Sequence, residues 1–202
     1  EWFLRRYTRF TSPQLRRHRT LDRLRLSAQK SKGTEDTAEQ TTDASVRGYV
    51  RSYAASGGER LALNLRQCVQ VTPRALSNLT ARERKSVRGL DLSDMRMDVA
   101  QATAWARVIK AYRSLALADF STNNIGDEGT AALSDALKTN STLETLELRS
   151  NKVGAAGAQS LAGMLQVNRA LNSVDLRFNQ IPDEGKQQLR DAVKGKNTTL
   201  QL

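Results

Sequence analysis

The chain has 202 residues, with 32 Lys and Arg against 21 Asp and Glu, one Cys and one His. A single Cys excludes an internal disulfide framework and a multi-cysteine zinc site, and a single His excludes a histidine-cluster metal site. No apolar run reaches the roughly 18 residues of a membrane-spanning helix, so none is expected. The net charge of +11 predicts an anionic partner.

Residues 1–30 are predicted to form an extended basic arm. They contain nine basic and two acidic residues, a net charge of +7, interleaved with aromatic rings. Because arginines neutralise phosphates and aromatic rings stack on unpaired bases, this composition predicts RNA binding without sequence specificity. Docking of the arm on an acidic protein or a lipid surface is the alternative. The candidate RNA-binding residues are Arg5, Arg6, Arg9, Arg16, Arg17, Arg19, Arg23 and Arg25.

The same segment indicates a location. An Arg-rich, acid-poor start without an initial Met is similar to the remainder of an organellar presequence. We therefore expect a mitochondrial protein, or otherwise a protein of another reducing intracellular compartment, which the single Cys also fits. An ordinary basic tail is the alternative.

Residues 31–58 are predicted to be a polar linker followed by a short helix. Residues 27–42 have few apolar side chains, which is typical of a solvated linker. Residues 44–55 are amphipathic and predict a helix that the Gly57-Gly58 pair ends.

Residues 59–202 contain an internal repeat with a period of 28 residues. Residues 115–142, 143–170 and 171–199 align with one another, and weaker copies start near Arg60 and Val87. Each copy contains a short L-x-L strand, a polar position, a turn and an amphipathic helix. Since one such unit cannot bury its apolar face alone, the roughly five copies are expected to stack on one another.

The repeat pattern, L-x-x-L-x-L-x-x-N/C-x-I/V, resembles the leucine-rich repeat proteins of the ribonuclease-inhibitor-like class. The resemblance implies an α/β solenoid with parallel strands on the concave face and helices on the convex face. It also implies a buried ladder of side chains that hydrogen-bond the turns of successive repeats. The ladder positions here are Cys68, Asn123, Asn151 and Asn179, and Met95 at the equivalent position predicts a distorted turn. A doubly wound α/β sheet is the alternative architecture, but it predicts longer strands and unequal connections.

The residue between the two strand leucines is expected to point outward on the concave face. In four neighbouring strands it is acidic, and parallel strands lie about 4.8 Å apart. These carboxylates, with two arginines that partly neutralise them, predict a surface that binds a basic polypeptide, including the chain's own arm. A row of merely solvated polar residues is the alternative. The candidate protein-binding residues are Asp91, Asp119, Glu147, Asp175, Arg149 and Arg177.

No catalytic motif is found: the sequence has no phosphate-binding loop, nucleophile elbow or dinucleotide fingerprint. We therefore expect no enzyme, no cofactor, no metal and no small-molecule substrate. The favoured hypothesis is a non-catalytic scaffold subunit of a mitochondrial ribosome, with the arm on rRNA and the solenoid on protein subunits. The alternatives are an accessory subunit of a respiratory or ATP-synthase membrane complex, and a free regulator that binds a basic protein.

Overall fold

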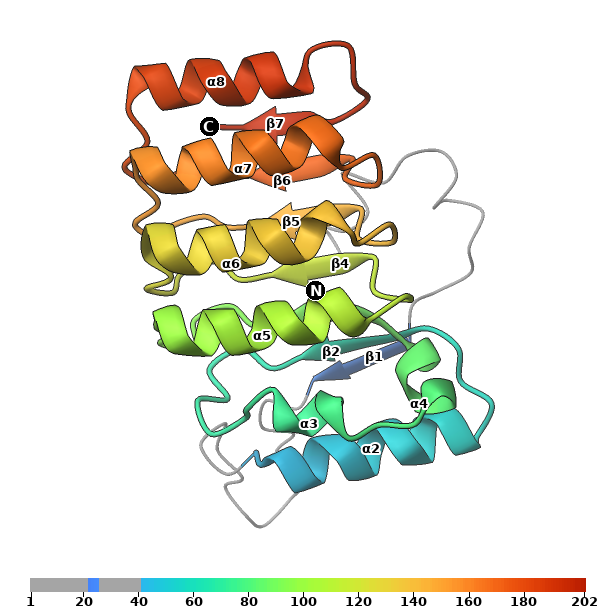
Figure 1. Cartoon of the computed structure of the whole chain (residues 1–202). Coiled ribbons are helices and arrows are strands. Elements are labelled where there is room, and N and C mark those ends of the chain that lie inside the picture. Colours follow the sequence, from blue (N-terminus) through green and yellow to red (C-terminus); the bar gives the residue numbers. More distant parts are fainter. Residues whose placement is uncertain (1–21, 26–40) are drawn as a thin grey trace.

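The computed structural model describes residues 22–25 and 41–202 (Figure 1). Most of the predicted arm and linker lies outside these residues. The arginines of the arm that fall outside are Arg5, Arg6, Arg9, Arg16, Arg17 and Arg19. Arg23 and Arg25 belong to a strand, of which only the backbone is described.

Seven parallel strands form one sheet in chain order. Four of them have only three residues, as the L-x-L pattern predicts. Because the order never reverses, the sheet is that of a solenoid and not of a doubly wound fold. The predicted α/β architecture of stacked repeats is confirmed. The strands are β1 (Asp22–Arg25), β2 (Leu61–Asn64), β3 (Val87–Asp91), β4 (Leu117–Asp119), β5 (Thr145–Glu147), β6 (Ser173–Asp175) and β7 (Thr199–Gln201).

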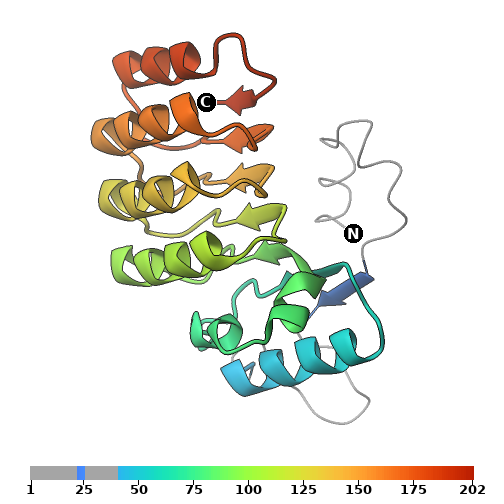
Figure 2. The ribbon, with the colours of Figure 1, turned by 45° about the vertical axis from the view of Figure 1, so that its right-hand side comes forward.

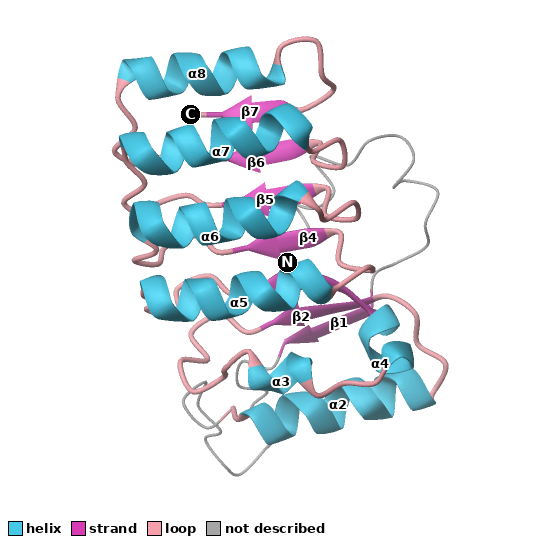
Figure 3. Ribbon diagram, in the orientation of Figure 1, coloured by secondary structure: helices cyan, strands magenta, loops and turns pink. Residues whose placement is uncertain are grey.

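The helices connect successive strands, and α5 to α8 form a second layer against the sheet (Figures 2 and 3). We call the opposite side of the sheet the strand face. No helix covers it in the part of the chain that the structure describes (Figure 2). The helices are α2 (Asp43–Ala55), α3 (Arg74–Ser77), α4 (Ala81–Ser86), α5 (Val99–Ala111), α6 (Gly126–Lys138), α7 (Ala155–Val167) and α8 (Asp183–Val193).

The core lies between the two layers and repeats with the sequence. Ala118, Leu146 and Val174 come from the successive strands β4, β5 and β6 and are fully buried. The helices face them with residues at the same period, such as Leu133 and Leu161, which are also fully buried. Each buried leucine or valine of this kind stabilises the fold by about 1.5–3 kcal/mol, so the repeated leucines determine the stacking.

The repeated glycine of the turn is required by close packing between neighbouring helices. A Cβ atom at Gly157 would lie 2.6 Å from Oδ1 of Asp127 and 2.7 Å from Cγ1 of Val153. The Oδ1 atom of Asp127 also accepts a hydrogen bond from the backbone N–H of Gly154 at 2.6 Å. The Gly154-to-Gly157 segment therefore joins two repeats and is not a phosphate-binding loop.

The solenoid starts earlier than the predicted boundary at residue 59. β1 lies within the predicted arm and pairs in parallel with β2, so that Leu24 is opposite Leu63. Helix α2 follows, and Thr42 caps it reciprocally with Ser45. A four-residue strand with three charged residues lacks the apolar alternation by which strands are recognised, which is why the sequence did not reveal β1.

Candidate protein-binding face

Four carboxylates occupy directly neighbouring positions on the strand face. In the register of the sheet Asp91 is opposite Asp119, Asp119 is opposite Glu147, and Glu147 is opposite Asp175. We call these four residues the acidic column. Their order follows from the repeat, because the same position of each copy enters the same position of each strand.

The carboxylates of the acidic column are buried on the strand face, which contradicts the alternative of a row of solvated polar residues. Their exposed fractions are 2% for Asp91, 2% for Asp119, 7% for Glu147 and 1% for Asp175. Asp91, Asp119 and Asp175 each accept a hydrogen bond from the backbone N–H of the residue two positions later. Oδ1 of Asp91 accepts from N and Oγ of Ser93 at 3.0 and 2.7 Å, and Oδ1 of Asp119 accepts from the N–H of Ser121 at 2.8 Å. This local bonding is typical of aspartate at a turn.

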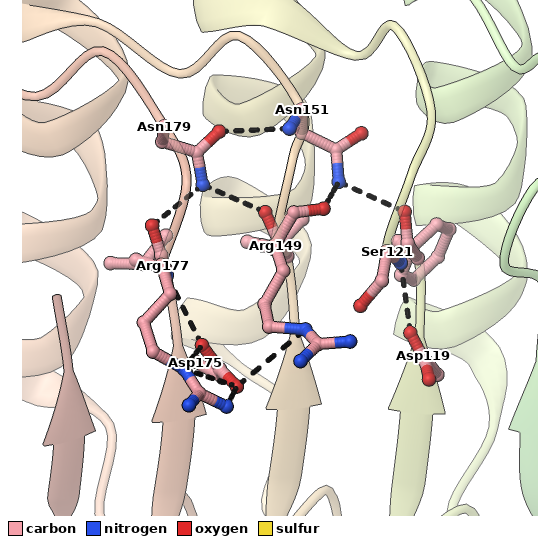
Figure 4. Close-up of polar contacts among 10 residues, drawn as sticks. Asp119, Ser121, Arg149, Asn151, Asp175, Arg177 and Asn179 are labelled. Carbon is pink, nitrogen blue, oxygen red and sulfur yellow. Dashed lines mark hydrogen bonds and ion pairs between the residues drawn. The ribbon is translucent and has the colours of Figure 1, made fainter.

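Two arginines neutralise the C-terminal member of the column (Figure 4). Arg177 binds Asp175 with two nitrogens: Nη2 lies 2.7 Å from Oδ2, and Nε lies 3.0 Å from Oδ1. This bond raises the pKa of the Arg177 guanidinium. Nε of Arg149 lies 3.8 Å from the same Oδ2 atom. The predicted partial neutralisation at this end is therefore present in the structure.

The other end of the column holds an unfavourable charge. Burial, and then the neighbouring charge of Asp119, raise the pKa of Asp91 to about 6, although the hydrogen bonds from Ser93 act in the opposite direction. Ser121 follows Asp119 by two residues, beyond the end of β4, and is 2% exposed. Its Oγ atom makes no hydrogen bond within the described chain. A cationic ligand would offset the charge of Asp91, and a hydrogen-bonding ligand would pair with the hydroxyl of Ser121.

The asparagine ladder joins the turns of successive repeats. Asn179 accepts from the N–H groups of Asn151 and Val153 at 2.9 and 3.0 Å and donates to the carbonyls of Leu148 and Leu176 at 2.9 and 2.8 Å. Asn123 likewise accepts from the N–H groups of Met95 and Met97 and donates to the carbonyls of Leu92 and Phe120. Asn151 donates to two carbonyls, whereas its Oδ1 atom has no hydrogen-bond partner within the described chain (Figure 4).

The two other ladder positions hold sulfur side chains. Cys68 is fully buried, its Sγ atom donates to the carbonyl of Arg66 at 3.6 Å, and burial raises the pKa of its thiol. The turn at Met95 is not distorted, so that prediction is wrong. Asp94 and Arg96 have the same left-handed backbone as Ser150 and Lys152 around Asn151. The N–H groups of Met95 and Met97 both donate to Oδ1 of Asn123, and so the next repeat holds this turn.

A second ladder, which was not predicted, lies where the helices end. Asn140 donates to the carbonyls of Ile109 and Tyr112 and accepts from the N–H groups of Thr142 and Leu143 at 2.9 Å. Asn168 repeats this pattern 28 residues later. At the next equivalent position Lys196 donates to the carbonyls of Leu165, Gln166 and Asn168. The signal was present in the sequence, because Asn140 and Asn168 are identical residues in two aligned copies.

The described residues show neither of two other site types. Residues 22–25 and 41–202 contain no group of three His, Cys, Asp or Glu side chains that could hold a metal ion. Within the same residues, no helix combines the length and the apolar character needed to cross a membrane.

The comparisons with known proteins agree with this architecture. A leucine-rich repeat family model matches residues 119–134, 139–162 and 167–186. The structure of leiomodin-1 actin-binding site 2 is similar, with a TM-score of 0.51 and 20% sequence identity over 72% of this chain and 85% of that one. No curated protein sequence matches the chain. The finer assignment to the ribonuclease-inhibitor-like class stays a prediction. The family match and the stacking of the repeats show that the chain contains leucine-rich repeats.

Proposed function

We propose that the chain is a non-catalytic scaffold subunit that holds a basic polypeptide on its strand face. Leucine-rich repeats imply a scaffold for protein interactions, and the similar leiomodin-1 structure is an actin-binding site. The observation that carries the proposal is the acidic column, which runs without interruption from β3 to β6. A peptide laid across these strands would meet one carboxylate about every 4.8 Å.

The buried charge of Asp91 in the acidic column favours a cationic ligand. The raised pKa of Asp91 means that this carboxylate is ionised at a cost, which a Lys or Arg side chain would remove. Ser121 offers a buried hydroxyl without a hydrogen-bond partner in the described chain. The chain's own residues 1–30, with a net charge of +7, are one segment of complementary charge. A basic tail of a neighbouring subunit is another.

Removing two charges from the column tests this proposal. We expect the pair Asp119→Asn and Glu147→Gln to weaken binding of an oligolysine peptide to the full chain by roughly tenfold, the scale of two charge interactions near a protein surface. The matched control is the pair Asp135→Asn and Glu184→Gln on exposed helix surfaces, which changes the net charge equally. Fluorescence anisotropy at low salt measures the affinity of each double variant for the peptide. Equal weakening by the two pairs would show that the peptide recognises only total charge.

The charge of residues 1–30 supports a second proposal, that the arm binds RNA in a large assembly. A mitochondrial ribosome is the favoured assembly, because the Arg-rich, acid-poor composition of this segment is similar to that of an organellar presequence. An accessory role in a respiratory or ATP-synthase complex would place the arm on acidic protein or lipid instead. Co-sedimentation from mitochondria separates these settings: the proposal expects the chain to travel with rRNA, and co-purification with a membrane complex contradicts it.

The RNA proposal also predicts a steep dependence on salt. The slope of log affinity against log salt concentration should decrease by roughly 0.7 for each phosphate of single-stranded RNA that the protein no longer neutralises. We expect Arg5→Gln, Arg6→Gln and Arg9→Gln together to reduce the slope by about two units, measured by filter binding. These substitutions preserve β1, which a deletion of residues 1–30 would remove from the sheet. The control triple variant is Arg107→Gln, Lys110→Gln and Arg190→Gln, and an equal reduction in that variant would contradict a role of the arm.

A further inference from the structure

A cationic pocket of about 280 Å³ lies at the N-terminal end of the solenoid. The end of α2, the segment before β2, helix α4 and strand β3 enclose it, and Figure 1 shows α4 beside the end of α2. None of its lining residues belongs to the acidic column. The charged lining residues are Arg60, Arg82, Lys85 and Arg88, with Glu59 as the one carboxylate among the described lining residues.

Helix α4 supplies two of the cations, and its own carboxylate, Glu83, contacts other residues instead of them. Arg82 and Lys85 are three residues apart and therefore share a helix face. Glu83 caps the start of the helix, where its Oε2 atom accepts a hydrogen bond from the N–H of Thr80 at 2.6 Å. Its other oxygen lies 3.3 Å from Nε of Arg51. No ion pair joins Arg82 or Lys85 to a carboxylate in the described chain, so their charges are available to a ligand.

The strand side of the pocket is held in place by hydrogen bonds. Nη1 of Arg88 donates to the carbonyl of Ser114 at 3.0 Å, which fixes that guanidinium at the start of β3. The backbone N–H of Arg60 donates to Oη of Tyr53 at 3.4 Å. Gly57 and Gly58 contribute backbone alone, which leaves space between the cations. The pocket therefore combines at least one pre-oriented cation with an open centre.

A concave site with four cations against one carboxylate concentrates anions, and arginine matches the geometry of phosphate oxygens. We propose that this pocket binds a phosphate monoester, with one phosphate group between Arg82, Lys85 and Arg88. The volume of about 280 Å³ accommodates the phosphate and part of the group attached to it. This inference is independent of the proposed function of the strand face.

Titration of the full chain with three probes tests the ligand chemistry. The probes are inorganic phosphate, adenosine 5′-monophosphate and adenosine, followed by the amide NMR signals of Gly57, Gly58 and Ser86. We expect saturable shifts with the monophosphate and weaker binding of phosphate alone, with no shifts from adenosine. Binding of adenosine as tight as that of the monophosphate would overturn the inference, as would the absence of saturation by any phosphate probe.

Matched charge variants test the location. The pair Arg82→Gln and Lys85→Gln should weaken monophosphate binding by roughly tenfold or more, whereas Arg107→Gln with Lys110→Gln, equally spaced on the exposed surface of α5, should change it less than about twofold. Glu59→Gln removes the opposing charge and should strengthen binding by about threefold. Equal weakening by the two pairs, or no gain from Glu59→Gln, would contradict a defined site.

Discussion

Replacing Asn140 with leucine is expected to reduce the free energy of unfolding by about 3–5 kcal/mol. The side chain is buried and serves four backbone groups: the carbonyls of Ile109 and Tyr112 and the N–H groups of Thr142 and Leu143. Leucine fills a similar volume but removes all four of these hydrogen bonds. Urea denaturation followed by circular dichroism measures the loss.

Two further variants make the Asn140 result specific. Asn140→Asp keeps the acceptor oxygen but places a buried carboxylate oxygen against the carbonyls of Ile109 and Tyr112, so a loss at least as large as that of the leucine variant is expected at neutral pH. Asn124→Leu is the matched control, because Asn124 is exposed and a change of about 0.5 kcal/mol or less is expected. A loss at Asn140 no larger than that at Asn124 would show that the second ladder contributes little to the stacking of repeats.

Replacing Asp91 with asparagine is expected to stabilise the chain at neutral pH by about 2–3 kcal/mol. The folded pKa of about 6 lies above the ordinary value of 3.8. Between these two pH values the folded chain binds more protons than the unfolded chain, so stability decreases as the pH rises through this window. Asparagine keeps the oxygen that accepts from Ser93 and removes the buried charge.

The pH profile distinguishes this effect from a simple change in packing. Thermal unfolding is to be measured from about pH 3.5 to about pH 7.5. The Asp91→Asn variant should be more stable than the original chain only above about pH 4, and the full difference in stability should be reached above about pH 6. Asp135→Asn, an exposed carboxylate paired with Lys138, should leave the profile almost unchanged. A variant that is less stable than the original chain at the upper end of this range would contradict a raised pKa at Asp91.

The repeat made most of the fold predictable. A 28-residue period with leucines in fixed positions determines parallel strands, helices on one side and the order of both. The same period placed Asp91, Asp119, Glu147 and Asp175 in one column, because the register of the sheet follows the repeat. What the period could not predict was their environment. Burial of a carboxylate depends on its conformation and on what packs around it, neither of which is a property of sequence spacing.

Features outside the repeat were harder to predict. β1 is too short and too charged for an alternating pattern, and α4 has a polar sequence, although Thr80 and Glu83 carry the signal of a capping box. The cationic pocket joins residues from positions 54 to 88 that share no motif. Its charges converge only because α4 packs beside α2, so the sequence alone located the basic excess at the arm and did not reveal the pocket in the folded part.

Zero-length cross-linking tests the central claim, that the strand face holds a basic polypeptide, most directly. A carbodiimide joins a lysine amine to a carboxylate only when the two touch, and mass spectrometry locates the bond. With an oligolysine peptide bound to the full chain, we expect cross-links at Glu147, whose exposed fraction of 7% is the largest in the acidic column. The exposed carboxylates of the helices, Asp135, Asp183 and Glu184, provide the comparison. Cross-links confined to those three helix residues would contradict a basic polypeptide on the strand face.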